Sequence, residues 1–142
     1  MIAFVDASVL LRVVLRQADA LAEWRHIEQG ISSALITTES LRTLDRLRLR
    51  TGLPDGEVAS RRAKILELIA PLDLVDVDSA VLDRAAQPMP TELGTLDAIH
   101  LATALLWKES TRSSRTMATH GRALGLAARA HGLSVVGIDT TR

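Results

Sequence analysis

The chain has 142 residues, of which 47% are hydrophobic and 24% charged, so it has the composition of an ordinary soluble globular protein with enough length to bury a core. It contains no cysteine, which excludes disulfides and thiolate metal sites. No apolar run approaches the roughly 20 residues that a membrane-spanning helix needs, and the first residues lack the pattern of a signal peptide. We therefore expect a cytoplasmic protein with no membrane partner.

The formal net charge is zero, but the charges are distributed unevenly along the chain. Seven basic and three acidic residues give residues 42–64 a charge of +4, whereas residues 67–97 carry −6. This asymmetry is more informative about partners than the net charge is, because local fields steer charged ligands. The basic segment is therefore a candidate contact for nucleic acid.

Hydrophobic periodicity and chain-breaking residues predict strands that alternate with helices. The first strand, Ile2–Val5, is short and apolar throughout, as is typical of a buried strand. In chain order, the predicted elements are a strand over 2–5, helices over 8–16 and 18–29, a strand over 34–37, helices over 38–51 and 55–69, a strand over 72–77, helices over 79–86 and 95–108, a strand over 115–119, a helix over 122–131 and a strand over 134–138.

Polar residues at the predicted helix starts and glycines at the ends support these boundaries. The expected caps are Ser8, Thr38, Ser79 and Thr95 at the starts, with Gly30 and Gly132 at the ends. Strands that alternate with helices predict a parallel sheet covered on both faces, within a single domain over residues 1–142. Ligands of such sheets bind beyond the carboxyl ends of the strands, near the point where the strand order reverses.

Three acids stand at the edges of apolar runs: Asp6 after the first strand, and Glu39 and Asp97 near the starts of predicted helices. All three can reach the same edge of the sheet. Carboxylates that are packed together repel one another and resist ionisation. A hard divalent cation such as Mg²⁺ relieves that repulsion. The sequence therefore predicts a metal site for phosphoryl chemistry.

Each acid also has a simpler interpretation when it is taken alone. Asp6 could form a turn at a strand end, and Glu39 and Asp97 could be acids that a helix N-terminus favours. Clustered acids also occur in phospho-accepting receiver-like domains. Those domains need a lysine near the acids, and Lys64 and Lys108 are badly placed for that role.

Three segments carry a likeness to a known family: residues 4–8 (Phe-Val-Asp-Ala-Ser), Thr38-Glu39, and residues 95–104 (Thr-Leu-Asp-Ala-Ile-His-Leu-Ala-Thr-Ala). They resemble the PIN-domain nucleases, and most of all the VapC-type toxins of bacterial toxin–antitoxin pairs. The resemblance implies an α/β fold, a three-layer α/β/α sandwich with a central parallel sheet. It also implies a Mg²⁺- or Mn²⁺-dependent endoribonuclease that cleaves tRNA or rRNA, dimerises, and is silenced by a cognate VapB-type antitoxin.

Residue by residue, Asp6, Glu39 and Asp97 match the metal-binding acids of that family. Ser8 matches a hydroxyl that often assists the first acid, and the resemblance gives Thr119 a supporting role in orienting a water molecule. The chain departs from the pattern at Gly121, where the family has a fourth acid. The alternative hypothesis is therefore a catalytically weakened protein that acts as an antitoxin- or RNA-binding partner.

Two further features remain open at this stage. Arg42, Arg46 and Arg50 recur every four residues and so share one helix face, which either follows an RNA backbone or is simply solvated, or serves a dimer or antitoxin contact. His100 lies three residues after Asp97 and is either packed in the core or a partner of the metal-binding acids. Of these two roles, packing is the expected one.

Overall fold

Strand β1 (Ile2–Val5) occupies the centre of a five-stranded parallel sheet in the computed structural model, which describes residues 1–18, 20–112 and 115–139. The strand order is β3-β2-β1-β4-β5, and every neighbouring pair runs parallel. The other strands are β2 (Gln29–Ser33), β3 (Asp73–Val75), β4 (Thr116–Ala118) and β5 (Ser134–Val136). The helices are α1 (Ala7–Val14), the 3₁₀ helix η1 (Ala22–His26), α2 (Leu35–Thr51), α3 (Asp55–Ile69), α4 (Ser79–Ala85), α5 (Thr95–Thr111) and α6 (Arg122–Ala130).

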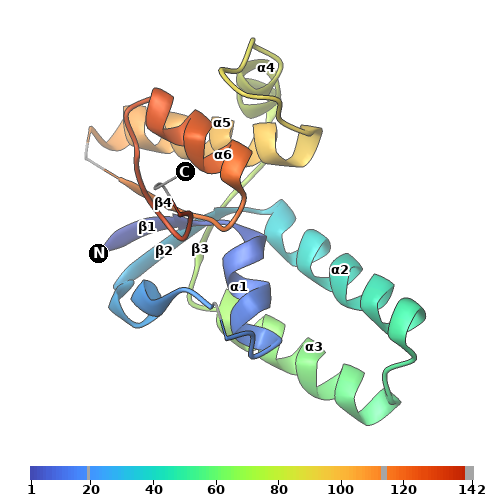
Figure 1. Ribbon diagram of the computed structural model, residues 1–142. Coiled ribbons are helices and arrows are strands. Elements are labelled where there is room, and N and C mark those ends of the chain that lie inside the picture. The colour runs from blue at the N-terminus through green and yellow to red at the C-terminus, as the bar shows by residue number, and fades with distance from the viewer. Residues whose placement is uncertain (19, 113–114, 140–142) are drawn as a thin grey trace.

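Helices cover both faces of this sheet (Figure 1). Successive side chains of a strand point to opposite faces, so Ala3 and Val5 pack with α1, α2 and α3, whereas Phe4 packs with α5 and α6. Helix α4 packs against α5 in a smaller third cluster. This arrangement confirms the predicted three-layer α/β/α sandwich, and it explains why β1 is apolar throughout.

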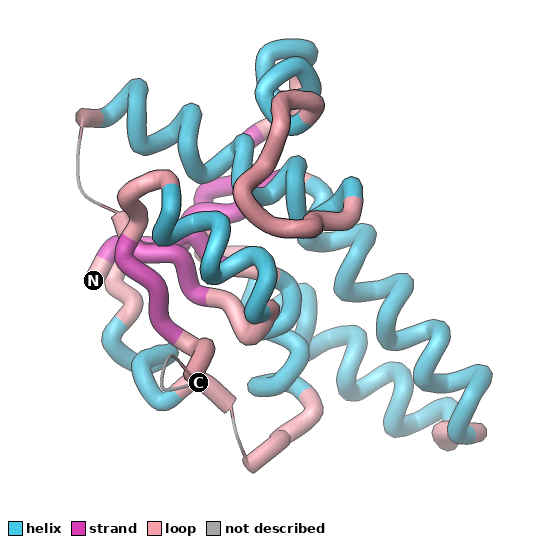
Figure 2. The backbone as a smooth tube through the Cα atoms, turned by 45° about the horizontal axis from the view of Figure 1, so that its top comes forward, coloured by secondary structure: helices cyan, strands magenta, loops and turns pink. Residues whose placement is uncertain are grey.

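The strand order reverses at β1. The chain passes from β1 to β2 and β3 on one side, and then returns to β4 and β5 on the other side. The carboxyl end of β1 is therefore the switch point at which open α/β sheets bind ligands, and Asp6 directly follows that end. Figures 1 and 2 also show α2 and α3 side by side as a hairpin that extends beyond the sheet.

The prediction for residues 18–37 is wrong. The described part of the predicted helix over 18–29, which excludes residue 19, contains η1 and the first residue of β2, because the strand lies at 29–33 rather than at 34–37. Strand β2 is not predicted from the sequence because its residues are mostly polar or small. Buried Ser32 donates its hydroxyl to the carbonyl of Val5 at 2.8 Å, and the Ser33 hydroxyl accepts from the amide of Leu35 at 3.1 Å, so both are buried at little cost.

Gly30 belongs to this strand instead of ending a helix. A β-carbon at Gly30 would overlap the end of the Leu72 side chain, which would have to move to admit a larger residue. Because α2 begins at Leu35, Glu39 lies in the second turn of that helix rather than at its N-terminus. The interpretation of Glu39 as a helix-start acid therefore fails.

The predicted N-caps are displaced by one or more residues. The N-cap positions are held by Asp6, Ala34, Asp78 and Gly94 in place of Ser8, Thr38, Ser79 and Thr95. Of these four, Asp78 uses its side chain, which accepts from the amide of Val81 at 3.0 Å. Gly132 lies one residue beyond the C-cap of α6, with φ +81°. None of the helices in the described part of the chain is long and apolar enough to cross a membrane.

Candidate metal centre

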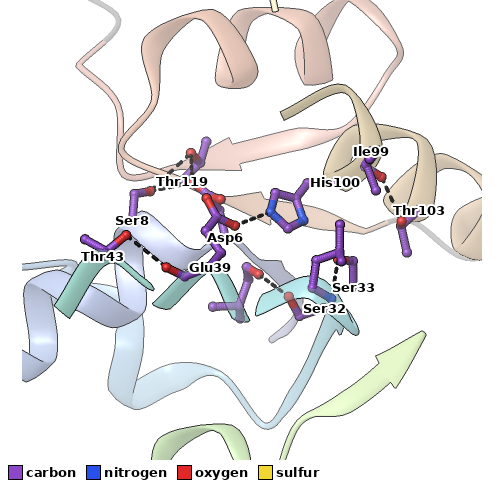
Figure 3. A network of polar contacts seen from close by, with 12 residues as sticks. Asp6, Ser8, Ser32, Ser33, Glu39, Thr43, Ile99, His100, Thr103 and Thr119 are labelled. Carbon is purple, nitrogen blue, oxygen red and sulfur yellow. Dashed lines mark hydrogen bonds and ion pairs between the residues drawn. The ribbon is translucent and has the colours of Figure 1, made fainter. Parts of the chain in front are cut away.

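Asp6 is the buried anchor of the site. Its side chain is 4% exposed, and its backbone amide donates to the carbonyl of Ala118, which fixes it between β1 and β4. Oδ2 accepts hydrogen bonds from the Ser8 hydroxyl at 2.5 Å and the Thr119 hydroxyl at 2.9 Å. Figure 3 shows Ser8 and Thr119 gathered around this carboxylate.

Both hydroxyls are locked as donors toward Asp6. The Ser8 oxygen already accepts from the backbone amide of His120 at 3.0 Å, and the Thr119 oxygen accepts from the amide of Gly121 at 2.9 Å. An ionised carboxylate only accepts, so the hydroxyls are the donors in both of the bonds to Oδ2 of Asp6. Within the described residues, the side-chain hydrogen bonds to this carboxylate all reach Oδ2, so Oδ1 is the oxygen available to a ligand.

Glu39 approaches from α2 and is held by His100 from α5. The His100 Nε2 atom lies 2.5 Å from Oε2 of Glu39, and His100 is fully buried while the Glu39 side chain is 19% exposed (Figure 3). One ligand atom each from Asp6, Glu39 and His100 lies within 4.8 Å of the others, which is close enough to share one ion. Packing alone is thus an incomplete description of His100.

The contacts of His100 favour a positioning role over metal ligation. An ionised carboxylate only accepts, so Nε2 carries the hydrogen that reaches Glu39. A histidine that binds a metal normally donates its other ring hydrogen to an acceptor, but buried Nδ1 has no partner within the described residues. His100 therefore orients Glu39 by donating a hydrogen bond to Oε2.

Asp97 completes the acidic cluster from the first turn of α5, where it is half-buried. Burial and the charge of Asp6 raise the pKa of Asp97 above 3.8; the charge of Glu39 adds to the rise, and His100 opposes it. Asp97 is outside the set of atoms within 4.8 Å, but these couplings place it in electrostatic contact with the other three residues. Of the three predicted acids, the fold thus brings Asp6 and Glu39 within 4.8 Å of each other, and Asp97 lies near enough for its pKa to respond to their charges.

The charge state of His100 reflects the same cluster. Burial disfavours its charged form, but the hydrogen bond and charge of Glu39, with the charges of Asp6 and Asp97, outweigh burial and raise the pKa of His100 above 6.5. The sequence signal for this role is its spacing, because residues three apart on a helix share a face. The donor set of three carboxylates fits a hard divalent cation, which oxygen ligands suit best.

The three arginines of α2 are not brought into this cluster. Arg42 is 60% exposed and its Nη1 binds Asp45 at 2.9 Å, while Arg46 donates to the Thr43 hydroxyl at 3.0 Å. Arg50 is exposed and lies eleven positions after Glu39 on the helix, which is about 16 Å along the axis. These side chains lie along the hairpin and are not part of the acidic centre.

Gly121 is the N-cap residue of α6, with φ −78°. A β-carbon added there would lie 3.4 Å from the Thr119 hydroxyl and 3.7 Å from Cβ of Leu124, which are ordinary or slightly tight contacts. The backbone therefore accepts a larger residue at this position. A side chain at 121 would start beside the hydroxyl that holds Asp6.

Comparison with known proteins agrees with this fold. The PIN domain family model matches residues 3–111. Ribonuclease VapC46 of Mycobacterium tuberculosis is 38% identical over 104 residues, covering 71% of this chain and 72% of that relative. Ribonuclease VapC35 from the same organism is 31% identical over 138 residues, which cover 94% of each chain. A toxin–antitoxin complex from Klebsiella pneumoniae has the same fold, with a TM-score of 0.61, 15% identity, and coverage of 97% of this chain and 96% of its own.

Proposed function

Since the chain belongs to the PIN-domain family, in its VapC type, we propose that residues 1–142 form one catalytic domain, a divalent-metal-dependent endoribonuclease that is the toxin of a toxin–antitoxin pair. The observation that carries this proposal is that Asp6 and Glu39 come within 4.8 Å of each other at the switch point of the sheet, with Asp97 coupled to both by charge. Two relatives whose names state ribonuclease activity support the reaction class.

Asp6 and Glu39 hold a Mg²⁺ or Mn²⁺ ion in this proposal, each with the oxygen that its hydrogen-bond partners leave available. When bound, such an ion supplies Lewis acidity to the scissile phosphate and activates water for attack. Ser8 and Thr119 keep Oδ2 of Asp6 saturated, which fixes the direction of Oδ1. Asp97 adds the third carboxylate, and burial and the charge of Asp6 raise its pKa, so a nearby cation would favour its charged form.

The proposed substrate is structured RNA, tRNA or rRNA, as the family resemblance implies. Arg42, Arg46 and Arg50 are proposed contacts for the RNA backbone farther from the reacting phosphate. Such contacts weaken as salt rises, because each one releases counterions. Their exposure and distance from Glu39 suit this outer role.

The proposed partners are a VapB-type antitoxin and a second copy of the chain. Support for the antitoxin comes from the Klebsiella pneumoniae structure, whose title describes a toxin–antitoxin complex. Homodimerisation rests on the family resemblance. Both partners can be tested by co-expression and by light scattering of the purified protein.

The alternative is a weakened enzyme that binds an antitoxin or RNA without cutting. The observation that favours it is Gly121, which places no side chain beside Thr119. In this case the three acids retain the metal poorly. Metal affinity near background, combined with tight antitoxin binding, would distinguish this function from catalysis.

The decisive experiment is cleavage of total tRNA and rRNA by the antitoxin-free protein with Mg²⁺, Mn²⁺ or EDTA, beside Asp97→Asn and Gly121→Asp. Metal-dependent cuts that Asp97→Asn loses would establish a nuclease that works with three acids. Cuts by Gly121→Asp alone would identify a toxin disarmed at one position. Silence in every sample would favour the binding protein.

A further inference from the structure

A short segment follows β5 and packs against α6. It comprises residues 137–139 and is called the strap below. The side chain of Ile138 occupies the space that a β-carbon at Gly125 of α6 would need. The carbonyl of Asp139 accepts a hydrogen bond from Arg122 Nη1 at 3.2 Å. The strap is therefore held in place although it belongs to no helix or strand, and the proposed reaction assigns it no role.

At Gly137 the strap contacts the loop that supports Asp6. Gly137 has φ +99°, and a β-carbon there would lie 2.3 Å from the backbone carbonyl oxygen of Thr119, so this close approach requires a glycine. The Thr119 hydroxyl donates to Oδ2 of Asp6 at 2.9 Å. The backbone of the strap thus contacts a residue whose side chain binds the buried anchor of the acidic centre.

The side chain of His120 fastens the strap to the same loop. A carbonyl only accepts, so His120 Nδ1 carries the hydrogen of the 2.7 Å bond to the carbonyl of Gly137. The other ring nitrogen, Nε2, is buried and has no partner within the described residues. Buried nitrogens usually have a partner, so the position of this ring is explained by its bond to Gly137.

The backbone of His120 bonds to the acidic centre, whereas its ring bonds to the strap. The amide of His120 donates to the Ser8 hydroxyl at 3.0 Å. The amide of the next residue donates to the Thr119 hydroxyl at 2.9 Å. Those two hydroxyls are the donors to Oδ2 of Asp6. A continuous series of bonds therefore leads from the strap through His120 to the carboxylate of Asp6.

We propose that His120 is a positioning residue for the metal centre, which couples the strap to the direction of the Asp6 carboxylate. This inference rests on the proposed function, because it concerns the ion that Asp6 would hold. Hydrogen-bond partners orient metal-binding side chains, and their loss typically lowers metal affinity or activity by about 10–100-fold. His120 acts one bond further from the ion than Ser8 does, so the expected effect lies near the lower limit of that range.

The test titrates each variant with Mn²⁺ well below its melting temperature. His120→Leu removes the donor to Gly137 and should weaken Mn²⁺ binding about tenfold. His120→Asn places an amide N–H where Nδ1 stands and should restore most of the affinity, which a role in packing alone would not allow. Lys108→Met is the matched control and should keep the wild-type affinity. It removes a comparable bond, to the carbonyl of Gly132, at the other end of α5 from Asp97.

A pair of glycine variants tests the strap itself. Gly137→Ala forces the strap away from the Thr119 carbonyl and should weaken Mn²⁺ binding as His120→Leu does. Gly132→Ala adds the same methyl group at another glycine of positive φ, +81°, where it meets the tip of Lys108. Both variants should lose stability through backbone strain, but Gly132→Ala should keep the wild-type affinity for Mn²⁺.

Amide hydrogen exchange follows the same series of bonds in the metal-free protein. The amides of His120 and Gly121 should exchange faster in His120→Leu and in Gly137→Ala, when each rate is compared with the amides of α3 in the same variant. The two control variants should leave these relative rates unchanged.

Wild-type Mn²⁺ affinity in His120→Leu would overturn the proposal, whatever the exchange rates show. An equal loss of affinity in Lys108→Met or Gly132→Ala would also overturn it, because the effect would then follow from stability alone. Failure of the proposed function gives a different result. A wild-type protein that binds Mn²⁺ but cuts no RNA would refute the nuclease and leave the positioning role of His120 supported, whereas one that binds no Mn²⁺ would refute both.

Discussion

The acidic centre and the α2–α3 hairpin both carry acids on helices, but they balance the charge in opposite ways. In the hairpin each of three acids has a basic partner within one helical turn: Asp45 with Arg42 and Arg48, Glu57 with Arg61, and Glu67 with Lys64. In the centre, the carboxylates of Asp6 and Glu39 come within 4.8 Å and Asp97 is coupled to both by charge, while the cationic group in the described residues is His100, which bonds to Glu39.

This difference indicates which of the two regions needs a bound cation. Exposed pairs in the hairpin neutralise one another in water, where such pairs contribute little to stability. The centre is buried and short of positive charge, so its acids repel until a cation arrives. Such an arrangement suits the binding of a cation.

The largest effect is expected for Asp97→Asn. The substitution keeps the shape of the side chain but removes one of the three charges that hold the metal, so RNA cleavage should fall by orders of magnitude. The metal-free melting temperature should rise, because burial and repulsion from Asp6 disfavour the charge of Asp97. Gel assays of RNA cleavage and circular dichroism melts measure the two quantities, and undiminished cleavage would refute the assigned site.

His100→Leu should have the next largest effect. Loss of the hydrogen bond to Glu39 leaves that carboxylate without its orienting donor, and such changes typically cost about 10–100-fold in metal affinity or activity. His100→Gln, whose amide can donate in the same direction, should recover part of the loss. Titration calorimetry with Mn²⁺ gives the affinity. A strong nitrogen coupling in the electron spin echo spectrum of bound Mn²⁺ would instead show that His100 is a ligand.

Metal and pH should act together on stability. Because the pKa of Asp97 is raised in the folded state, the free energy of unfolding falls as pH rises from about 3.8 through the folded pKa. The stabilisation from protonated His100 is present below pH 6.5 and is lost as pH rises through its folded pKa. The metal-free protein should therefore lose stability as pH rises. Mg²⁺ at 100 times its Kd should add about 2.7 kcal/mol at neutral pH. Melts in EDTA and in Mg²⁺ across pH 4–9 test this, and parallel curves would contradict it.

Gly121→Asp should strengthen metal binding at the acidic centre with little change in the stability of the metal-free protein. The position tolerates a β-carbon and is the N-cap of α6, where aspartate in place of glycine adds a few tenths of a kcal/mol. The added carboxylate starts beside Thr119, so the stabilisation by Mg²⁺ should exceed that of the wild type. Gly121→Asn supplies the same cap without the charge and serves as the control. An equal response of both variants to Mg²⁺ would show that position 121 does not reach the metal.

The smallest effect is expected in the hairpin. The hydrogen bond from Arg48 and the charges of Arg48 and Arg42 lower the pKa of half-buried Asp45. The small stabilisation from its ion pairs is therefore present above pH 3.8 and is lost as pH falls through the lower folded pKa. Asp45→Asn should leave the melting temperature at neutral pH unchanged within error. RNA affinity should rise slightly if the arginine face of α2 follows the backbone. A large drop in stability would show that the hairpin relies on its pairs after all.

Much of the fold, and the three acids, can be predicted from the sequence. Strand β1 and helix α3 are predictable because one is continuously apolar and the other lies between Pro54 and Pro71. The acids at 6, 39 and 97 stand out because each interrupts or borders an apolar run. Their convergence follows from a parallel sheet, whose strands all end at one edge.

The rest depended on contacts that local patterns do not encode. Strand β2 looks like a loop because Ser32 and Ser33 bury their hydroxyls only by bonding to distant or neighbouring backbone. The bond from His100 to Glu39 joins residues 61 apart, and no spacing rule predicts it. Thr119 was identified through the family resemblance, but its bond to Asp6 required the pairing of β1 with β4.

That last bond has a consequence for how the protein is made. Asp6 is supported by a hydroxyl 113 residues later in the chain, so its environment is complete only after strand β4 has docked beside β1. Contacts between such distant segments form late, because a long loop must close first. A nascent chain that has emerged only as far as α5 carries all three acids but lacks the strand that holds the first of them. During synthesis, cleavage activity should therefore appear only after residues 116–119 have been made and β4 has docked beside β1.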